Sequence, residues 1–378
     1  MQHPSDHIFS FTPESLGSWC ESRGMASFRG KQILEWVYQK GVCDPAAMSS
    51  LSKRDRDLLA AEMTLLSGDA IRHQLATDGT QKLLVQWRSY SATSNPGSAQ
   101  PLPRTSLPIL NQPSVAEDSS RQTECVMIPT EDRRTACISS QVGCPVGCRF
   151  CASGLGGLDG NLSSGRIVEQ VWRLAQLEGV GRISNVVFMG MGEPLSNFRN
   201  VTDAIRTLTS LWGPGISARK ITISTVGLPQ AITKLADEFD LPVTLALSLH
   251  APDDTIRRRL IPWAEYTTIE ELLKACQRWF DKTGREITLE YTLLRDVNDR
   301  PKHAEQLAQI ARTLRANINL IRYNEVNGLE FQRPRNTDVI EFQKVLRKHA
   351  INAHIRASRG RDIAAACGQL RHEAAGAS

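Results

Sequence analysis

Residues 137–157, CISSQVGCPVGCRFCASGLGG, carry the pattern from which the rest of the chain can be interpreted. They hold Cys144, Cys148 and Cys151 in a C-x3-C-x2-C run, on a glycine-punctuated loop that follows a strand-like stretch. Because an iron–sulfur cluster normally takes one thiolate per iron, three cysteines on a four-iron cluster leave one iron free to bind and activate a substrate. The spacing therefore predicts a catalytic [4Fe-4S] site.

A structural zinc site, or reduced cysteines without a metal, is the alternative interpretation of this run. Structural zinc prefers two separated ligand pairs in a closed set of four, and no second pair occurs here. The chain has nine cysteines among 378 residues, too few for a disulfide scaffold, and four of them fall between Cys137 and Cys151. This clustering indicates a site with its own chemistry.

The chain beyond Thr135 alternates between strand-like and helix-like stretches. This alternation predicts parallel βαβ units. A doubly wound sheet and a full or partial barrel both satisfy it, and in either fold the reactive groups gather at the carboxyl ends of the strands. The predicted strands lie within residues 183–190, 219–225, 242–250, 286–294, 318–324 and 352–358.

The first part of the chain has a different pattern. Apolar residues recur at helical spacing between about Leu16 and Met63, which predicts a small helical module. Residues 81–87 and 125–128 are expected to form two short strands of a hairpin. Between these strands, residues 89–122 are rich in Ser, Pro and Asn, which predicts a disordered insertion; a Pro-rich segment that binds a partner is the alternative.

Charge and hydropathy limit the class of protein only loosely. The formal net charge of +5 permits a polyanionic partner, but many proteins with such a charge never touch nucleic acid. The first residues lack the pattern of a signal peptide, and the longest apolar run, around Pro242 to Leu249, is too short to span a bilayer. We therefore expect a cytoplasmic protein that is not attached to a membrane.

Several motifs occur in the order that is typical of one known family. They resemble the RlmN/Cfr methyltransferases, a branch of the radical SAM superfamily, over nearly the entire chain except the insertion. The barrel motifs are residues 137–157, MGMGEPL (189–195), STVG (224–227), LSLHAP (247–252) and RGRDIAAACGQL (359–370). The motifs of the accessory domain are FRGKQILEWVYQKG (28–41) and LSKRDRDLL (51–59).

The resemblance implies an α/β fold built as a partial (β/α)6 radical SAM barrel, with a small helical accessory domain and a short β-hairpin linker. The expected domains are a helical, RNA-binding accessory domain at 1–66, a hairpin linker with the insertion at 67–134, and the barrel at 135–378. In the accessory domain, aromatic and basic residues are interleaved. We expect its aromatic residues, such as Trp36 and Tyr38, in the core and its cations on the surface.

The same resemblance implies two cofactors. Cys144, Cys148 and Cys151 would hold a [4Fe-4S] cluster, and S-adenosylmethionine, used twice per turnover, would chelate the fourth iron. A Gly-rich turn with a carboxylate, such as 189–194, suits the amino-acid end of this ligand, whereas a lone strand-end Ser or Asn can equally be a cap or turn residue. The expected ligand contacts are Gly192, Glu193, Ser224, Ser248, Leu249, His250 and Asn324.

Three further residues acquire roles only through the resemblance. From the sequence alone, Cys137 and Cys367 are more often buried small hydrophobic residues, and Glu124 a solvated strand carboxylate. In the implied mechanism the Cys367 thiolate takes a methyl group from one S-adenosylmethionine, and a radical made from a second one activates that methyl for addition to an adenine carbon. Glu124 would be the proton acceptor, and Cys137 would release the RNA by forming a transient disulfide with Cys367.

The implied substrate is an adenosine in 23S rRNA, methylated at C2, with some tRNAs as second substrates and an electron donor such as flavodoxin. Methylation at C8 is the main rival. A non-catalytic RNA-binding protein with a structural metal, and a radical enzyme that acts on a peptide or small molecule, are rivals from other classes. We expect a monomer, and a target base that leaves its stack to reach the site.

Overall fold

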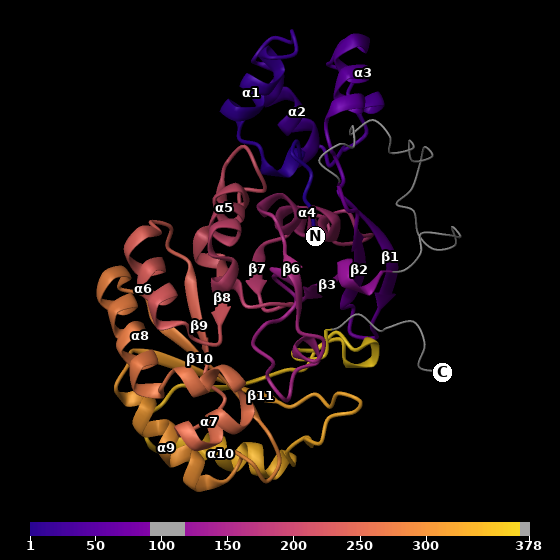
Figure 1. Cartoon of the computed structure of the whole chain (residues 1–378). Helices are drawn as coiled ribbons and strands as arrows, with labels where there is room; N and C mark the ends of the chain where they lie inside the picture. Colours follow the sequence, from indigo (N-terminus) through magenta and orange to yellow (C-terminus); the bar gives the residue numbers. More distant parts are fainter. Residues whose placement is uncertain (91–117, 371–378) are drawn as a thin grey trace.

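The computed structural model describes residues 1–90 and 118–370, and a long curved sheet dominates it (Figure 1). In this sheet the strands follow the order β1-β2-β3-β4-β7-β8-β9-β10-β11-β12. Strands β5 (Gln141–Gly143) and β6 (Leu158–Asn161) form a separate pair beside it. The strands of the large sheet are β1 (Gly68–Leu75), β2 (Gln81–Trp87), β3 (Gln122–Pro129), β4 (Arg134–Cys137), β7 (Asn185–Phe188), β8 (Ile221–Thr225), β9 (Thr244–Ser248), β10 (Ile287–Leu293), β11 (Ala316–Arg322) and β12 (Ala353–Arg356).

From β4 to β12 all neighbouring strands are parallel, which confirms the predicted βαβ units. Helices connect these strands, and Figure 1 shows α5, α6, α8, α9 and α10 on the outer side of the curve. Strands β1 and β12 stand at opposite ends of the strand order, so the sheet is an open, partial barrel, as the resemblance implied. The connecting helices are α4 (Ser164–Ala175), α5 (Phe198–Thr209), α6 (Pro229–Glu238), α7 (Asp254–Leu260), α8 (Ile269–Thr283), α9 (Pro301–Arg312) and α10 (Asn336–Lys348).

The helical module at the beginning of the chain contains α1 (Pro13–Glu21), α2 (Arg29–Tyr38) and α3 (Lys53–Glu62). A capping box at Thr12 starts α1, and α1 and α2 approach so closely that a Cβ on Gly30 would lie 2.7 Å from the Gly17 nitrogen. Trp36 and Tyr38 are half-buried and pack against the main core, in agreement with their interpretation as packing residues. The close helix contact and the shared core make this module a packed unit.

A buried ionic cluster joins this module to the barrel. The Glu169 carboxylate on α4 is fully buried and lies 3.0 Å from His7 Nε2 and 2.7 Å from an Arg173 nitrogen. It also accepts hydrogen bonds from the Ser67 backbone NH (2.9 Å) and hydroxyl (2.7 Å). These interactions hold the pKa of Glu169 down at about 2 although burial opposes this, so the carboxylate is ionised and the junction is fixed by charge.

The linker differs from its prediction in three respects. The hairpin of β2 and β3 is confirmed, but β1 was not predicted, and β3 begins at Gln122 rather than at 125. The predicted limits of the insertion, 89–122, were too wide, because the Asp118 NH donates to Gln86 Oε1 (2.9 Å) and Gln122 already pairs with Gln86 in the sheet. The remainder of the predicted insertion, 91–117, lies outside the described residues. Pairing of β3 with β4 makes the hairpin a continuation of the barrel sheet.

Among the helices in residues 1–90 and 118–370, none is both long and apolar enough to cross a bilayer.

Candidate active site

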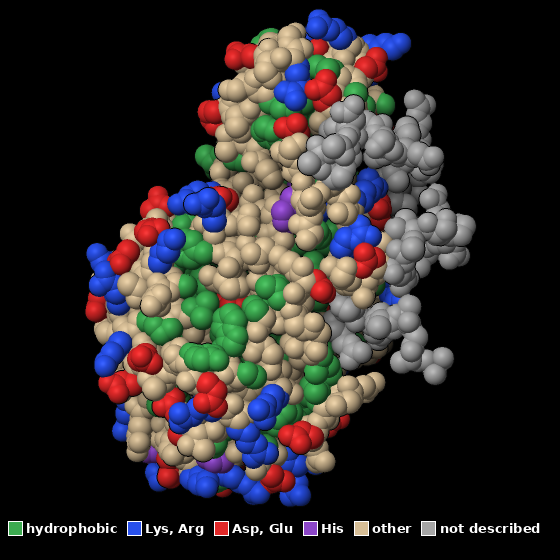
Figure 2. All heavy atoms as spheres, viewed as in Figure 1, with side chains coloured by type: hydrophobic (Ala, Val, Ile, Leu, Met, Phe, Trp, Pro, Cys, Tyr) green, Lys and Arg blue, Asp and Glu red, His purple; other side chains and the backbone are tan. Residues whose placement is uncertain are grey.

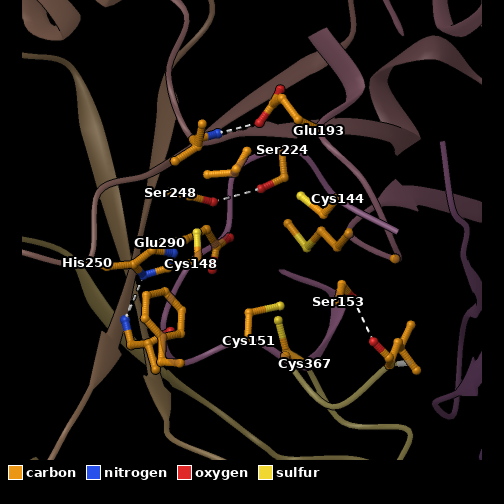
Figure 3. A pocket seen from close by; sticks show the side chains of 18 of the residues that line it. Cys144, Cys148, Cys151, Ser153, Glu193, Ser224, Ser248, His250, Glu290 and Cys367 are labelled. Atoms are coloured by element: carbon orange, nitrogen blue, oxygen red, sulfur yellow. Dashed lines mark hydrogen bonds between the residues drawn. The ribbon is translucent and has the colours of Figure 1, made fainter. Parts of the chain in front are cut away.

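A pocket opens at the carboxyl ends of the parallel strands, where the alternation of strands and helices predicted the reactive groups (Figure 3). It encloses about 930 Å³ of space between its lining atoms, and part of this space is open to solvent. Nine of the predicted site residues line it: Cys144, Cys148, Cys151, Gly192, Glu193, Ser224, Ser248, His250 and Cys367. The sequence motifs, which are far apart in the chain, therefore meet in one place.

The loop with the three cysteines is held in shape by close backbone contacts. Gly143 has a φ of +74°, and a Cβ there would lie 2.0 Å from the Gly157 carbonyl oxygen, which also accepts a hydrogen bond from the Cys144 NH (2.7 Å). On the other side, the Arg149 NH donates to the carbonyl of Leu260 at the end of α7 (2.9 Å). The loop is thus clamped between the β5–β6 pair and α7.

The three thiols of this loop are half-buried and stand around the middle of the pocket rather than side by side (Figure 3). Within residues 1–90 and 118–370, no three His, Cys, Asp or Glu side chains form a group that could hold a single metal ion. A cluster that takes one thiolate per iron needs separated thiols. Burial raises the pKa of Cys144 to about 12, so the free thiol is protonated and must lose its proton to bind iron.

The turn after β7 places Gly192 and Glu193 against the loop. Gly192 has a φ of +102°, and a Cβ there would lie 2.7 Å from the Gln141 Cβ, so only glycine fits without strain. The Glu193 carboxylate accepts hydrogen bonds from the NH groups of Leu195 (3.0 Å) and Val226 (2.8 Å). Burial raises the pKa of Glu193 above its usual value, and these NH groups oppose the shift. The carboxylate therefore shapes the pocket wall besides lining it.

Strands β8 and β9 add hydroxyl groups and an imidazole. The hydroxyl oxygens of Ser224 and Ser248 are 3.3 Å apart, close enough for a hydrogen bond. His250 is held at a φ of +56°, and its Nδ1 accepts a hydrogen bond from the Thr292 NH (3.0 Å). Burial first, and the charge of Arg257 second, lower the pKa of His250 to about 3. This imidazole is therefore neutral at physiological pH.

Two of the predicted ligand contacts are not among the pocket-lining residues. Leu249 is fully buried, with its NH bonded to the Glu290 carbonyl (3.1 Å). Asn324 Nδ2 donates to the carbonyl of Cys367 (3.2 Å), and Asn324 Oδ1 accepts from Arg333 (3.1 Å). The structure thus places Asn324 beneath the segment that carries Cys367.

That segment, residues 360–370, is called the carrier segment below. It lies against the cysteine loop: the Ala152 NH donates to the Gly368 carbonyl (2.8 Å) and the Ser153 hydroxyl donates to the Leu370 carbonyl (2.6 Å). Cys367 faces the pocket and is solvent-exposed through it, although the protein around it still raises the pKa of the thiol to about 11 by desolvation. This cysteine shares the pocket with the three-cysteine loop (Figure 3).

Cys137 and Glu124 lie behind the carrier segment instead of in the pocket. Cys137, at the end of β4, is 8% exposed and packs in a small cluster with Ala365 and Leu370. Burial, and then the nearby Cys367 thiol, raise the pKa of Cys137 to about 12. Glu124, on β3, is 4% exposed and forms an ion pair with Lys82, Nζ to Oε1 2.7 Å.

Comparison with known proteins identifies the family. Residues 7–65 match the model of the ribosomal RNA large subunit methyltransferase N-terminal domain, and residues 138–308 match the model of the radical SAM superfamily. A probable dual-specificity RNA methyltransferase RlmN from Prochlorococcus marinus (strain NATL1A) is 40% identical to this chain, over 97% of the chain and 94% of that protein. The chain belongs to the RlmN family of radical SAM methyltransferases.

Two further relatives agree with this membership. The probable dual-specificity RNA methyltransferase RlmN from Thermosynechococcus vestitus (strain NIES-2133 / IAM M-273 / BP-1) is 42% identical, over 94% of this chain and 95% of that protein. The crystal structure of a radical SAM methyltransferase from Sphaerobacter thermophilus superposes with a TM-score of 0.86 at 36% identity, covering 97% of this chain and 99% of that chain. The RlmN-type fold therefore extends over both the helical module and the barrel.

Membership in the radical SAM superfamily implies a [4Fe-4S] cluster and S-adenosylmethionine as cofactors. The pocket fits this pair: separated thiols line it, and the Ser224 and Ser248 hydroxyls can bind polar groups of the ligand. A carboxylate that the sequence motifs did not single out, Glu290 on β10, also lines it, with Oε1 bonded to Asn319 (2.9 Å). An acidic residue in the otherwise uncharged, strand-like run ITLEYTL was the signal that could have identified it.

Proposed function

We propose that this chain methylates C2 of an adenosine in 23S rRNA, and of an adenosine in some tRNAs, by a radical route through a methylated cysteine. The observation that carries the proposal is the position of Cys367. It lines the same pocket as Cys144, Cys148 and Cys151, whereas Cys137 is buried behind the carrier segment. A methyl carrier between a radical source and a resolving thiol needs this arrangement.

In the proposal, Cys144, Cys148 and Cys151 hold the cluster. S-adenosylmethionine is oriented by the pocket-lining residues Gly192, Glu193, Ser224, Ser248 and His250, which Leu249 and Asn324 support from outside the lining. When bound, the cluster supplies the electron that cleaves this ligand to a 5'-deoxyadenosyl radical. The clamped loop and the neutral His250 keep the site in one geometry without adding a second positive charge beside the sulfonium. The residues of the chain then determine what is methylated.

Cys367 acts first as a nucleophile. Its thiol loses a proton, and its sulfur forms a bond to the methyl carbon of S-adenosylmethionine as the bond from that carbon to the sulfonium breaks. The 5'-deoxyadenosyl radical takes a hydrogen atom from this methyl group and becomes 5'-deoxyadenosine, and the carbon radical left on Cys367 forms a bond to C2 that joins RNA and enzyme covalently. The unpaired electron that this addition leaves on the ring would return to the oxidised cluster. Glu124 takes the ring proton, and Cys137 attacks the sulfur of Cys367, so that the carbon leaves with its electron pair, takes up a proton and becomes the methyl group on the RNA.

The partners in this proposal are two substrates, 23S rRNA and tRNA, and a one-electron donor such as flavodoxin. The enzyme itself is proposed to be a cytoplasmic monomer. RNA binding is supported by exposed Lys31 and Lys40 on the helical module, although Figure 2 shows acidic and basic side chains mixed there. The same view shows hydrophobic side chains gathered in the middle of the face, where an unstacked base would find apolar contacts.

The test is mass spectrometry of RNA after anaerobic incubation of the iron- and sulfide-reconstituted protein with S-adenosylmethionine, a reductant and either 23S rRNA or tRNA. We expect a methyl group on C2 of one adenosine, together with 5'-deoxyadenosine. A methyl group on C8 would replace the proposed regiochemistry by the rival one. Absence of bound iron and of 5'-deoxyadenosine would favour a non-catalytic RNA-binding protein, and unmodified RNA with 5'-deoxyadenosine formed would point to another radical substrate.

A further inference from the structure

A buried lysine stands between the proposed proton acceptor and the carrier segment. Lys82 is on β2 and Glu124 on β3, and their side chains are 7% and 6% exposed. In the antiparallel register Leu84 pairs with Glu124 and Lys82 with Val126, so Lys82 and Glu124 are diagonal neighbours on one face of the sheet. Their ion pair of 2.7 Å therefore forms inside the protein.

Burying two charges is expensive in free energy, and an apolar pair of similar volume is often as stable or more stable. Every residue of β2 is buried, which makes a lysine at this position an unusual choice for packing alone. The ion pair is weak evidence of a contribution to stability. Its position suggests a role in the reaction instead.

The second contact of Lys82 reaches the carrier segment. Nζ donates a hydrogen bond to the carbonyl oxygen of Ala364 (3.2 Å), three residues before Cys367. Ala364 has a φ of +49°, which is uncommon for a residue with a side chain and needs support from its surroundings. One ammonium group thus holds both the Glu124 carboxylate and the backbone that carries the methyl-accepting cysteine.

The turn between β1 and β2 provides further anchors for the same segment. The Thr77 NH donates to the Asp362 carboxylate (2.9 Å), and the Gly360 NH donates to the Asp78 carboxylate (3.0 Å). These contacts are at or near the surface and do not involve Glu124. They make it possible to separate the effect of loosening the carrier segment from the effect of losing Lys82.

We propose that Lys82 is a positioning residue for the methylation reaction. It holds the Glu124 carboxylate at a fixed position relative to Cys367, so that this carboxylate can accept the ring proton of the covalent RNA adduct. This inference rests on the proposed function. In the step concerned, the ring C–H bond breaks, its electron pair stays in the ring and the proton moves to Glu124. Lys82 takes no proton in this step, and its 2.7 Å contact with Oε1 fixes the direction in which the Glu124 carboxylate points.

The experiment compares the reconstituted full-length protein with its Lys82→Met, Lys82→Gln and Lys82→Arg variants, using RNA with hydrogen or deuterium on the target carbon. Three quantities are measured in a single turnover: the methyl group on Cys367, 5'-deoxyadenosine, and released methylated RNA against RNA still bound covalently. The matched control is Asp362→Ala, which removes a surface anchor of the carrier segment and leaves Lys82 and Glu124 in place. Lys82→Gln keeps a hydrogen-bond donor in case Lys82→Met does not fold.

For Lys82→Met and Lys82→Gln we expect Cys367 methylation and 5'-deoxyadenosine within about twofold of the unaltered protein, but release of methylated RNA slowed by about ten- to a hundredfold. Release should also acquire a deuterium isotope effect that Asp362→Ala lacks. Lys82→Arg should recover part of the rate. A merely structural role would not produce an isotope effect.

Two outcomes would overturn the inference. One is equal loss of all three quantities in the Lys82 variants and in Asp362→Ala, which would reduce Lys82 to an anchor of the carrier segment. The other is slower release without an isotope effect. Failure of the proposed function is distinguishable, because the unaltered protein would then give no methylated RNA, and failure of the role of Glu124 would appear as normal release in Glu124→Gln.

Discussion

The pocket and the region behind the carrier segment differ in how they meet solvent. The pocket is open, and the three cysteines proposed to hold the cluster are half-buried in its lining. Behind the carrier segment, Cys137 and Glu124 are 8% and 4% exposed. The difference indicates that a ligand can enter the pocket from solvent, whereas the groups proposed to act on the RNA adduct are shielded from it.

The largest effect should come from the open region. Cys144→Ala removes one of the three proposed ligands, so we expect loss of bound iron and a fall in 5'-deoxyadenosine to the background level, because incomplete ligation leaves no reducible cluster. Iron analysis and chromatography of the reaction products measure both. Cys276→Ala, in the buried core on α8, is the matched control and should retain iron. Normal 5'-deoxyadenosine from Cys144→Ala would contradict the assignment.

A change in the buried region should separate the two regions. Cys137→Ala removes the resolving thiol, so 5'-deoxyadenosine should form normally while released methylated RNA falls by about a hundredfold or more and RNA remains attached to Cys367. Denaturing gels and mass spectrometry of the digested adduct measure this. The control is Cys125→Ala, which changes a buried cysteine on the neighbouring strand β3 and should not increase the amount of RNA attached to Cys367. Only free RNA from Cys137→Ala would contradict the role.

The pH dependence of the first methyl transfer tests Cys367, which lies between the pocket and the region behind the carrier segment. Desolvation raises the pKa of Cys367 to about 11, and the thiolate is the reactive form. Below this pKa the thiolate fraction grows about tenfold per pH unit. We therefore expect Cys367 methylation, followed by intact-protein mass without reductant, to accelerate by up to about a hundredfold from pH 7 to pH 9. A flat profile would show that the thiol ionises more easily than its surroundings imply.

The smallest effect concerns the pocket wall. Gly192→Ala would place a Cβ 2.7 Å from Gln141 at a φ of +102°, so we expect about a tenfold weaker affinity for S-adenosylmethionine and about 1–3 kcal/mol lower stability. Calorimetric titration and thermal unfolding measure these changes. Gly156→Ala is the matched control, because a Cβ there meets nothing within 4 Å. Equal behaviour of the two variants would refute the steric argument.

The sequence predicted the parallel part of the fold better than its edges. Strands β8 (ITIST) and β9 (TLALS) are short runs rich in β-branched or apolar residues, and they are buried or half-buried in the sheet, so residue type alone indicated them. Strand β1 was missed because its residues, GDAIRHQL, are mostly half-buried at the edge of the sheet and show no clear alternation. The predicted insertion was too long because Gln122 pairs with Gln86 in the sheet. This contact is distant in sequence, and the polar composition around Gln122 does not indicate it.

For the site, the sequence identified residues within motifs and missed their partners. The three-cysteine spacing and the strand-end hydroxyls are local patterns. Lys82 was missed because its ion-pair partner, Glu124, comes from another strand that the sequence does not place beside it. Glu290 did carry a local signal, an acidic residue in a strand-like run, but it lies outside the motifs. The position of Asn324 beneath Cys367 likewise depends on how the carrier segment folds back.

The ionic junction at Glu169 has a consequence for the RNA substrate. The buried Glu169 carboxylate on α4 contacts His7 and Ser67 from the first part of the chain, and Arg173 of the same helix balances its charge, so this junction holds the helical module in place on the barrel. A module held in this way does not adapt its position to the RNA. We therefore expect the RNA to do the bending, and an adenosine in a strand that already yields easily to be modified in preference to one in a stiff duplex.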